Sequence, residues 1–143
     1  ALKDPDMLRQ LNHWGMHFFA RFDRQLWIVR LGLALMFIES AVDKALHFPF
    51  YVHQATDMGI PFAPLAIAAA LFVETAGSLA LMTGVALAPC LLALAGYTLI
   101  VNFFYFDFWN MTDIAATGAR KEFLKNIAVA SGLVGLIFGT SRS

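Results

Sequence analysis

The chain alternates between long apolar runs and short polar stretches, and four runs are long enough to cross a lipid bilayer. A crossing helix needs about 20 mostly apolar residues. The runs cover residues 26–48, 64–84, 89–109 and 123–139. None has the alternation of a barrel strand, and a backbone in lipid must satisfy its hydrogen bonds internally, so helices are predicted. The last run is the shortest, and its crossing needs either Lys125 to extend toward the headgroups or the bilayer to become thinner.

The stretch before the first run, residues 7–24, is amphipathic. Its apolar residues recur at helical spacing, and its basic and amide side chains fall mainly on the opposite face. This pattern predicts a helix lying flat in the headgroup region, the alternative being a helix packed on a partner protein. The expected fold is all-α, with an N-terminal amphipathic interfacial helix in residues 1–25 and a four-transmembrane-helix bundle in residues 26–143.

Composition supports this membrane assignment. Hydrophobic residues make up 59% of the 143 residues and charged residues only 14%, against about 25% charged residues in a soluble domain. The mean hydropathy is +0.67. Membrane lipids are therefore expected partners, and the formal net charge of zero gives no reason to expect nucleic acid.

Basic residues favour one orientation. Four of them precede the first run, namely Lys3, Arg9, Arg21 and Arg24. Because Lys and Arg accumulate on the cytoplasmic side and an even number of crossings returns the chain to its starting side, both termini are expected to be cytoplasmic. Residues 49–63 and 110–122 are then expected to form outward-facing loops, whereas the connection at residues 85–88 is short enough for an antiparallel hairpin.

Two carboxylates fall deep within predicted crossings, Glu39 in the first and Glu74 in the second. A charged group at that depth is costly, so such residues usually face the bundle interior and pair with a partner. One interpretation is contact with a proton or a quinone head group, and the other is a buried pair that fixes helix register. Glu39 is expected to face the interior near the level of Glu74.

Other polar groups in the crossings complete the candidate site. Arg30 and Lys44 share one stripe of the first helix, with Phe37 between them, and either could orient a head group. Asn102 and Asn126 are interpreted as partners in a hydrogen bond between helices. No histidine lies in the last three runs, so haem ligation is not expected. We expect no metal site and no cofactor bound through the chain's own ligands, with quinone or lipid as the remaining small-molecule candidates.

Several short motifs make the chain resemble the DoxX family of small four-helix membrane proteins. The motifs are Arg30 and Gly32 with Lys44, Gly59-Ile60-Pro61, Glu74 and Gly77 with Gly84, Asp107-Phe108-Trp109-Asn110, and Phe123-Leu124-Lys125-Asn126. Phe106 departs from the family's HDFWN element, in which His stands at this position. The resemblance implies a four-helix membrane fold, placement in a bacterial cytoplasmic (inner) membrane, and association with membrane redox systems such as a respiratory chain.

Three functions follow from the residues and this resemblance. The first is an accessory or anchoring subunit of a larger membrane electron-transfer complex, without redox ligands of its own. The second is a quinone-handling oxidoreductase subunit that uses Glu74, Arg30 and Lys44. The third is a small transporter or assembly factor. The first is preferred, so the chain is expected to be a non-catalytic subunit in a larger membrane complex rather than an enzyme by itself.

Overall fold

The computed structural model describes the backbone of residues 5–140 and the side chains of residues 26–139. This part of the chain is helical and contains no strand. The elements in order are α1 (Pro5–Leu46), α2 (Phe48–Asp57), α3 (Ala63–Thr83), α4 (Leu87–Tyr105), the 3₁₀ turn η1 (Phe108–Asn110) and α5 (Asp113–Thr140).

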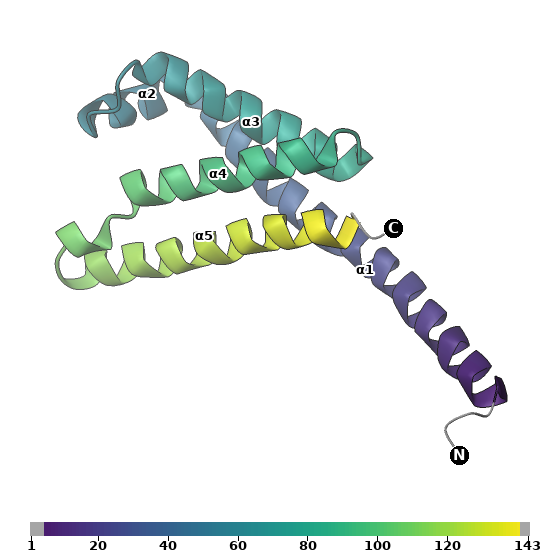
Figure 1. Ribbon diagram of the computed structural model, residues 1–143. Coiled ribbons are helices and arrows are strands. Elements are labelled where there is room, and N and C mark those ends of the chain that lie inside the picture. Colours follow the sequence, from purple (N-terminus) through teal and green to yellow (C-terminus); the bar gives the residue numbers. More distant parts are fainter. Residues whose placement is uncertain (1–4, 141–143) are drawn as a thin grey trace.

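The long helices pack in a row, α1 on α3, α3 on α4 and α4 on α5 (Figure 1). The row closes at one end, where Gly139 of α5 lies so near Leu26 of α1 that a Cβ at Gly139 would be 3.4 Å from Leu26 Cδ1. At the opposite end of the bundle α1 and α5 diverge, as Figure 1 shows. The seam between the first and last helices is therefore closed on one side of the bundle and open on the other.

A core of leucine and alanine side chains joins all four long helices. Its most deeply buried members are Ala34 and Phe37 of α1, Leu81 of α3, Leu91 and Leu94 of α4, and Leu133 and Leu136 of α5. Many large apolar side chains point outward instead, including Phe72, Leu92, Ile100 and Phe138. An apolar exterior around a close-packed interior is what a lipid-facing bundle requires.

Proline and glycine mark the ends of the predicted helices. Pro49 lies in the first turn of α2 and Pro64 in the first turn of α3, where a missing N–H costs no hydrogen bond. Gly84 ends α3 in the left-handed conformation, with φ of 80°, that glycine adopts without strain. Three residues separate α3 from α4, which confirms the predicted antiparallel hairpin.

The predicted boundaries are correct for α3 but need correction in three other places. The supposed loop at residues 49–63 contains helix α2, whose Ala55 is buried against Ile67 of α3. The third helix ends at Tyr105, before Trp109, and the separate 3₁₀ turn η1 follows after two non-helical residues. The last helix begins at Asp113, ten positions before Phe123 (123 − 113), so it is longer than α4 and not the shortest crossing. These additional turns were not predicted, because the polar residues Arg120 to Glu122 resemble a loop in sequence alone.

Within the described residues, three helices are long and apolar enough to cross a membrane: Ala63–Thr83, Leu87–Asn110 and Asp113–Gly139. The charged residues of α1, among them Arg30 and Lys44, distinguish it from these three. A fourth crossing by α1 therefore stays a prediction. α1 runs without a break from Pro5 to Leu46, but the side chains of residues 1–25 lie outside the described part, so their interfacial placement is likewise untested.

Candidate functional site

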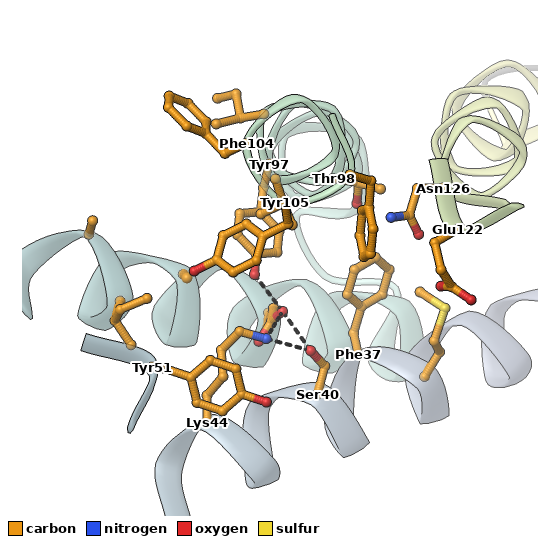
Figure 2. Close-up of a pocket in the computed structure, with 18 of the residues that line it drawn as sticks. Phe37, Ser40, Lys44, Tyr51, Tyr97, Thr98, Phe104, Tyr105, Glu122 and Asn126 are labelled. Atoms are coloured by element: carbon orange, nitrogen blue, oxygen red, sulfur yellow. Dashed lines mark hydrogen bonds and ion pairs between the residues drawn. The ribbon is translucent and has the colours of Figure 1, made fainter. Parts of the chain in front are cut away.

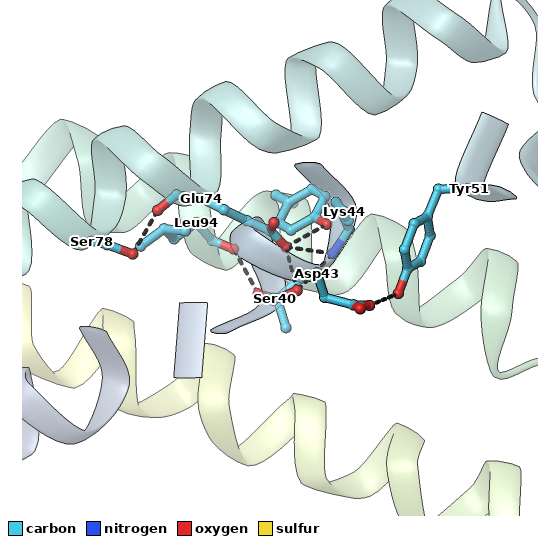
Figure 3. Close-up of polar contacts among 9 residues, drawn as sticks. Ser40, Asp43, Lys44, Tyr51, Glu74, Ser78 and Leu94 are labelled. Carbon is cyan, nitrogen blue, oxygen red and sulfur yellow. Dashed lines mark hydrogen bonds and ion pairs between the residues drawn. The ribbon is translucent and has the colours of Figure 1, made fainter. Parts of the chain in front are cut away.

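A polar network centred on Glu74 lies between α1, α3 and α4 (Figure 3). Glu74 is 1% exposed, and its Oε1 atom accepts three hydrogen bonds. Lys44 Nζ donates at 3.0 Å, Ser40 Oγ at 2.9 Å and the Tyr97 hydroxyl at 2.8 Å. Lys44 also donates to Ser40 Oγ at 2.6 Å. The carboxylate thus has its counter-charge from α1 and a phenol donor from α4.

The helix register explains why Tyr97 reaches Glu74. One turn along α3 is Gly77, and one turn back along α4 is Leu94, as expected for antiparallel neighbours. The Leu94 side chain occupies the space beside Gly77, where an added Cβ would come within 2.3 Å of Leu94 Cδ1. Gly77 therefore lets α4 approach α3 closely enough for the Tyr97 hydroxyl to bond the carboxylate. The spacing of Glu74 and Gly77 therefore has a structural role, because Gly77 makes room for the helix contact that brings Tyr97 to Glu74.

The second carboxylate oxygen of Glu74 has no partner. Among the described side chains, Oε2 is buried and receives no hydrogen bond. Buried polar atoms are nearly always paired, and an unpaired acceptor costs about 1–3 kcal/mol. The network therefore concentrates its donors on one oxygen and leaves the other free to accept.

A cavity of about 430 Å³ lies beside this network, within the size range of small-molecule sites. Figure 2 shows Lys44, Ser40 and Tyr97 converging on its polar wall, with aromatic rings around them. The lining combines the polar network with apolar and aromatic side chains: Phe37, Ile67, Ala70, Tyr97, Thr98, Val101, Phe104 and Tyr105. A polar centre within an apolar, aromatic wall suits a ring molecule with a small polar head group.

The cavity opens where α1 and α5 diverge. Its edge includes Met36 and Glu39 of α1 and Glu122 and Lys125 of α5. The side chains of Met36, Glu39 and Lys125 are exposed, so the cavity reaches the outside of the chain there. A ligand with an apolar tail can therefore place its head at Glu74 and its tail toward lipid.

Helix α2 covers the end of the cavity through Tyr51. The Lys44 ammonium lies 5.4 Å from the centre of the Tyr51 ring, within cation–π distance. The Tyr51 hydroxyl donates to Asp43 Oδ2, and this hydrogen bond raises the pKa of Tyr51 to about 12. Tyr51 therefore stays a neutral donor at physiological pH. His47 Nδ1 lies 3.0 Å from Asp43 Oδ1 on the exposed side of the same group.

The structure brings Lys44 and Glu74 together and places Arg30 elsewhere. Arg30 Nε donates to the carbonyl oxygen of Leu81 at 2.8 Å, near the other end of α3. The shared stripe of Arg30, Phe37 and Lys44 is confirmed, because Phe37 is buried and both basic residues contact α3. A head-group role for Arg30 has no support, since Arg30 does not line the cavity.

The interior placement predicted for Glu39 is wrong. Its side chain is exposed, although it reaches the edge of the cavity. Glu39 is five positions before Lys44, which turns it about 140° away from that residue on the helix. When Lys44 faces α3, Glu39 must therefore face outward. The depth of Glu39 along α1 could be predicted from the sequence. The direction of its side chain could not, because it depends on which stripe of α1 packs against α3.

The interhelical hydrogen bond predicted for the two asparagines is confirmed. Asn126 Nδ2 of α5 donates to Asn102 Oδ1 of α4 at 3.1 Å. Asn102 is fully buried, and its Nδ2 donates to the backbone carbonyl of Phe123 at 3.0 Å. Asn126 also lines the cavity, but both amides are already paired. Their arrangement supports a structural role in joining α4 to α5.

Sequence reasoning missed Ser40, Tyr97 and Tyr51. Ser40 lies one turn before Lys44, and nothing in the sequence distinguishes it from other small residues in membrane helices. Tyr97 is one of only three tyrosines in the chain and carries the only hydroxyphenyl ring in the middle of its apolar run, which was a usable signal. In the part of the chain with described side chains, no group of three His, Cys, Asp or Glu residues could hold a metal ion.

These features define the class of protein: an all-helical integral membrane protein whose bundle holds a buried ion pair beside a cavity. A family model described as DoxX matches residues 25–106, more than half of the chain. The chain belongs to the DoxX family. The match includes the helices that carry Lys44, Glu74 and Tyr97, and it ends before the Asp107–Asn110 and Phe123–Asn126 motifs.

One curated relative adds to this result. Over 109 residues, 76% of this chain and 78% of the relative, the sequence is 26% identical to the inner membrane protein YphA of Escherichia coli (strain K12). No solved structure matches the chain. The family model thus supplies the DoxX assignment, and the location in the relative's name agrees with a membrane protein.

Proposed function

We propose that this chain is an inner-membrane protein that binds a quinone in the cavity beside Glu74. The observation that carries the proposal is the convergence of Lys44, Ser40 and Tyr97 on one buried carboxylate at the wall of an aromatic cavity. The membrane assignment draws support from the apolar helices and from the named location of the relative.

The residues fit the head group of such a molecule. Lys44 supplies N–H donors, the free Oε2 atom of Glu74 supplies an acceptor, and Phe104 and Tyr105 supply ring faces. A bound quinone would supply two-electron, two-proton redox chemistry at this place. The chain's own residues would hold the ring, exclude water from it and keep an ionisable group next to its oxygen atoms.

Photolabelling tests the proposal. A photoreactive azido-quinone should label peptides from α3 and α4, and an excess of unreactive quinone should prevent the labelling. Ala66→Phe should abolish it, because Ala66 lines the cavity. The matched control is Ala69→Phe, since Ala69 is exposed and lies outside the lining. Labelling that survives Ala66→Phe as well as Ala69→Phe would contradict the proposal.

A second role, as an accessory subunit of a larger electron-transfer complex, is supported by Glu39. This carboxylate is exposed on a face of α1 that also exposes Leu35 and Val42. A charge facing hydrocarbon costs about 2.5 kcal/mol or more, so a basic or donor side chain from another subunit would stabilise it. The two roles are compatible, because Glu39 lies at the edge of the cavity.

Native gels of the source membrane test this second role. The chain should migrate together with haem or flavin absorbance, and Glu39→Gln should weaken that association while leaving the helical content unchanged. Arg120→Gln is a suitable control, because Arg120 is exposed and does not line the cavity. A chain that is released from its own membrane alone and stable would rule out the accessory role.

A further inference from the structure

We propose that the cavity prefers a ring ligand that carries a hydroxyl donor, so that the reduced, hydroquinone form binds more tightly than the oxidised quinone form. This inference rests on the proposed function for the ring ligand and adds the chemical form that the site selects. It is carried by the uneven distribution of hydrogen-bond donors around Glu74.

The donors around Glu74 all converge on one atom. Oε1 accepts from Lys44, Ser40 and Tyr97, whereas Oε2 is buried without a hydrogen bond among the described side chains. An ionised carboxylate has about four lone-pair sites, shared by its two oxygens. Oε2 therefore has unused acceptor capacity that a donor from a ligand can fill.

The remaining polar groups of the cavity wall discriminate between the two ring forms. Lys44 has three N–H donors, of which two bond Ser40 and Glu74. A quinone carbonyl can accept from the third, but it brings no hydrogen for Oε2. A ring hydroxyl can accept from Lys44 and donate to Glu74 at the same time. The hydroxyl form thus satisfies both groups, and the carbonyl form satisfies one.

The carboxylate can turn to meet such a donor. Glu74 forms part of the cavity wall, and its Oε2 atom is enclosed by the surrounding side chains. The terminal torsion of Glu is broad, so a turn of the carboxylate can bring Oε2 toward the cavity, and the donors on Oε1 would move with that oxygen. The hydrogen bond that forms is to a charged acceptor, which makes it stronger than a neutral one.

Direct binding measurements test the preference. The full chain in lipid nanodiscs would be titrated anaerobically with a decyl-tailed benzoquinone, its hydroquinone and the dimethyl ether of that hydroquinone, with tryptophan fluorescence as the readout. The hydroquinone should bind about tenfold more tightly than the other two, the ratio expected for one hydrogen bond to a charged group.

Two variants locate the effect. Glu74→Gln, which turns the free oxygen into an N–H donor, should remove or reverse the preference for hydroquinone. Asp57→Asn is the control, because Asp57 is an exposed carboxylate that does not line the cavity, and it should leave the ratio unchanged. The three-ligand comparison on the unaltered chain holds even if Glu74→Gln fails to fold.

The outcomes separate this inference from the proposed function. If none of the three compounds binds, both fail. If all three bind with equal affinity, a ring site exists but the preference is overturned. If the dimethyl ether matches the hydroquinone, the ligand donates no hydrogen bond and the inference is again overturned. A preference that persists in Glu74→Gln would overturn the assignment to this carboxylate.

Discussion

Glu74 obtains its counter-charge from α1 and its phenol donor from α4, so a single side chain connects three helices. A buried charge is tolerated when it is paired and hydrogen-bonded, and it becomes strongly destabilising when one partner is removed. Lys44 is the charged partner, with 14% of its side chain exposed. At the scale of the residue, the stability of the bundle and the chemistry of the cavity depend on the same pair.

Removing the Lys44 charge tests this dependence. Lys44→Met should lower the free energy of unfolding by about 3–5 kcal/mol, because it leaves a buried carboxylate without its counter-ion. The double variant Lys44→Met with Glu74→Leu should recover most of that loss, since a buried pair can be replaced by apolar residues at little cost. Reversible unfolding in mixed micelles, followed by circular dichroism, measures both.

The pair of Lys125 and Glu122 provides the control for this measurement. It is a salt bridge between residues with exposed side chains on α5, and exposed pairs contribute little. Lys125→Met should therefore leave the unfolding transition nearly unchanged. If the double variant at Lys44 and Glu74 is no more stable than Lys44→Met alone, the loss does not come from an uncompensated charge.

At the scale of the element, α3 is the central helix of the bundle. It packs on both α1 and α4, and its first residues contact α2. Small residues make this possible, because Ala70, Gly77, Ser78 and Ala80 are all buried. Helices in membranes approach closely where such residues replace bulky ones. The position of Tyr97 relative to Glu74 is set by this close approach.

Adding a methyl group at Gly77 tests the contact between α3 and α4. Gly77→Ala should destabilise the bundle by about 1–3 kcal/mol, because the new Cβ overlaps the Leu94 side chain and overpacks the core. The shift of α4 should also lengthen the Tyr97–Glu74 hydrogen bond and weaken binding of the proposed ligand. Thermal unfolding and the nanodisc titration measure the two effects.

Gly96 of α4 is the matched position for the same substitution. Nothing lies within 4 Å of an added Cβ there, so Gly96→Ala should stabilise the helix by about 0.5–1 kcal/mol. Opposite signs at Gly77 and Gly96 are the expected result. Equal effects would mean that helix propensity, and not the contact with Leu94, determines the outcome.

At the scale of the whole molecule, the seam between α1 and α5 differs between the two ends of the bundle. It is closed near Leu26 and Gly139 and open at the cavity. If both termini are cytoplasmic, as the basic residues before the first run predict, the open part of the seam would lie in the outer half of the membrane. The proposed ligand would then enter laterally from the outer leaflet.

Cysteine labelling tests this topology. After Cys90→Ala, a membrane-impermeant maleimide should label His53→Cys and Thr112→Cys in intact cells, because both residues are exposed and the predicted topology places both outside the membrane. Val85→Cys, in the hairpin between α3 and α4, should react only after lysis. Labelling of His53→Cys and Val85→Cys from the same side would contradict the four-crossing arrangement.

Several features could be predicted from particular residues. Pro64 and Gly84 define the ends of α3, because a proline in the first turn and a glycine in the left-handed conformation suit a helix start and end. The periodicity of Arg30, Phe37 and Lys44 identified a shared stripe of α1, and the structure shows that both basic residues of this stripe contact α3. The additional turns of α5 before Phe123 could not be predicted, because Arg120 and Lys121 are as compatible with a loop as with a helix.

The sequence by itself determined that the chain is helical and lipid-embedded, and that Glu74 needs a partner, because apolar run length and the cost of a buried charge are local properties. The tertiary structure decided which partner it has. The close approach of α4 at Gly77 places Tyr97 within hydrogen-bonding distance of Glu74. The rotation of α1 about its axis points Lys44 toward Glu74 and Glu39 outward. The divergence of α1 and α5 leaves a cavity. These outcomes depend on how helices distant in sequence pack together, and no local pattern encodes that arrangement.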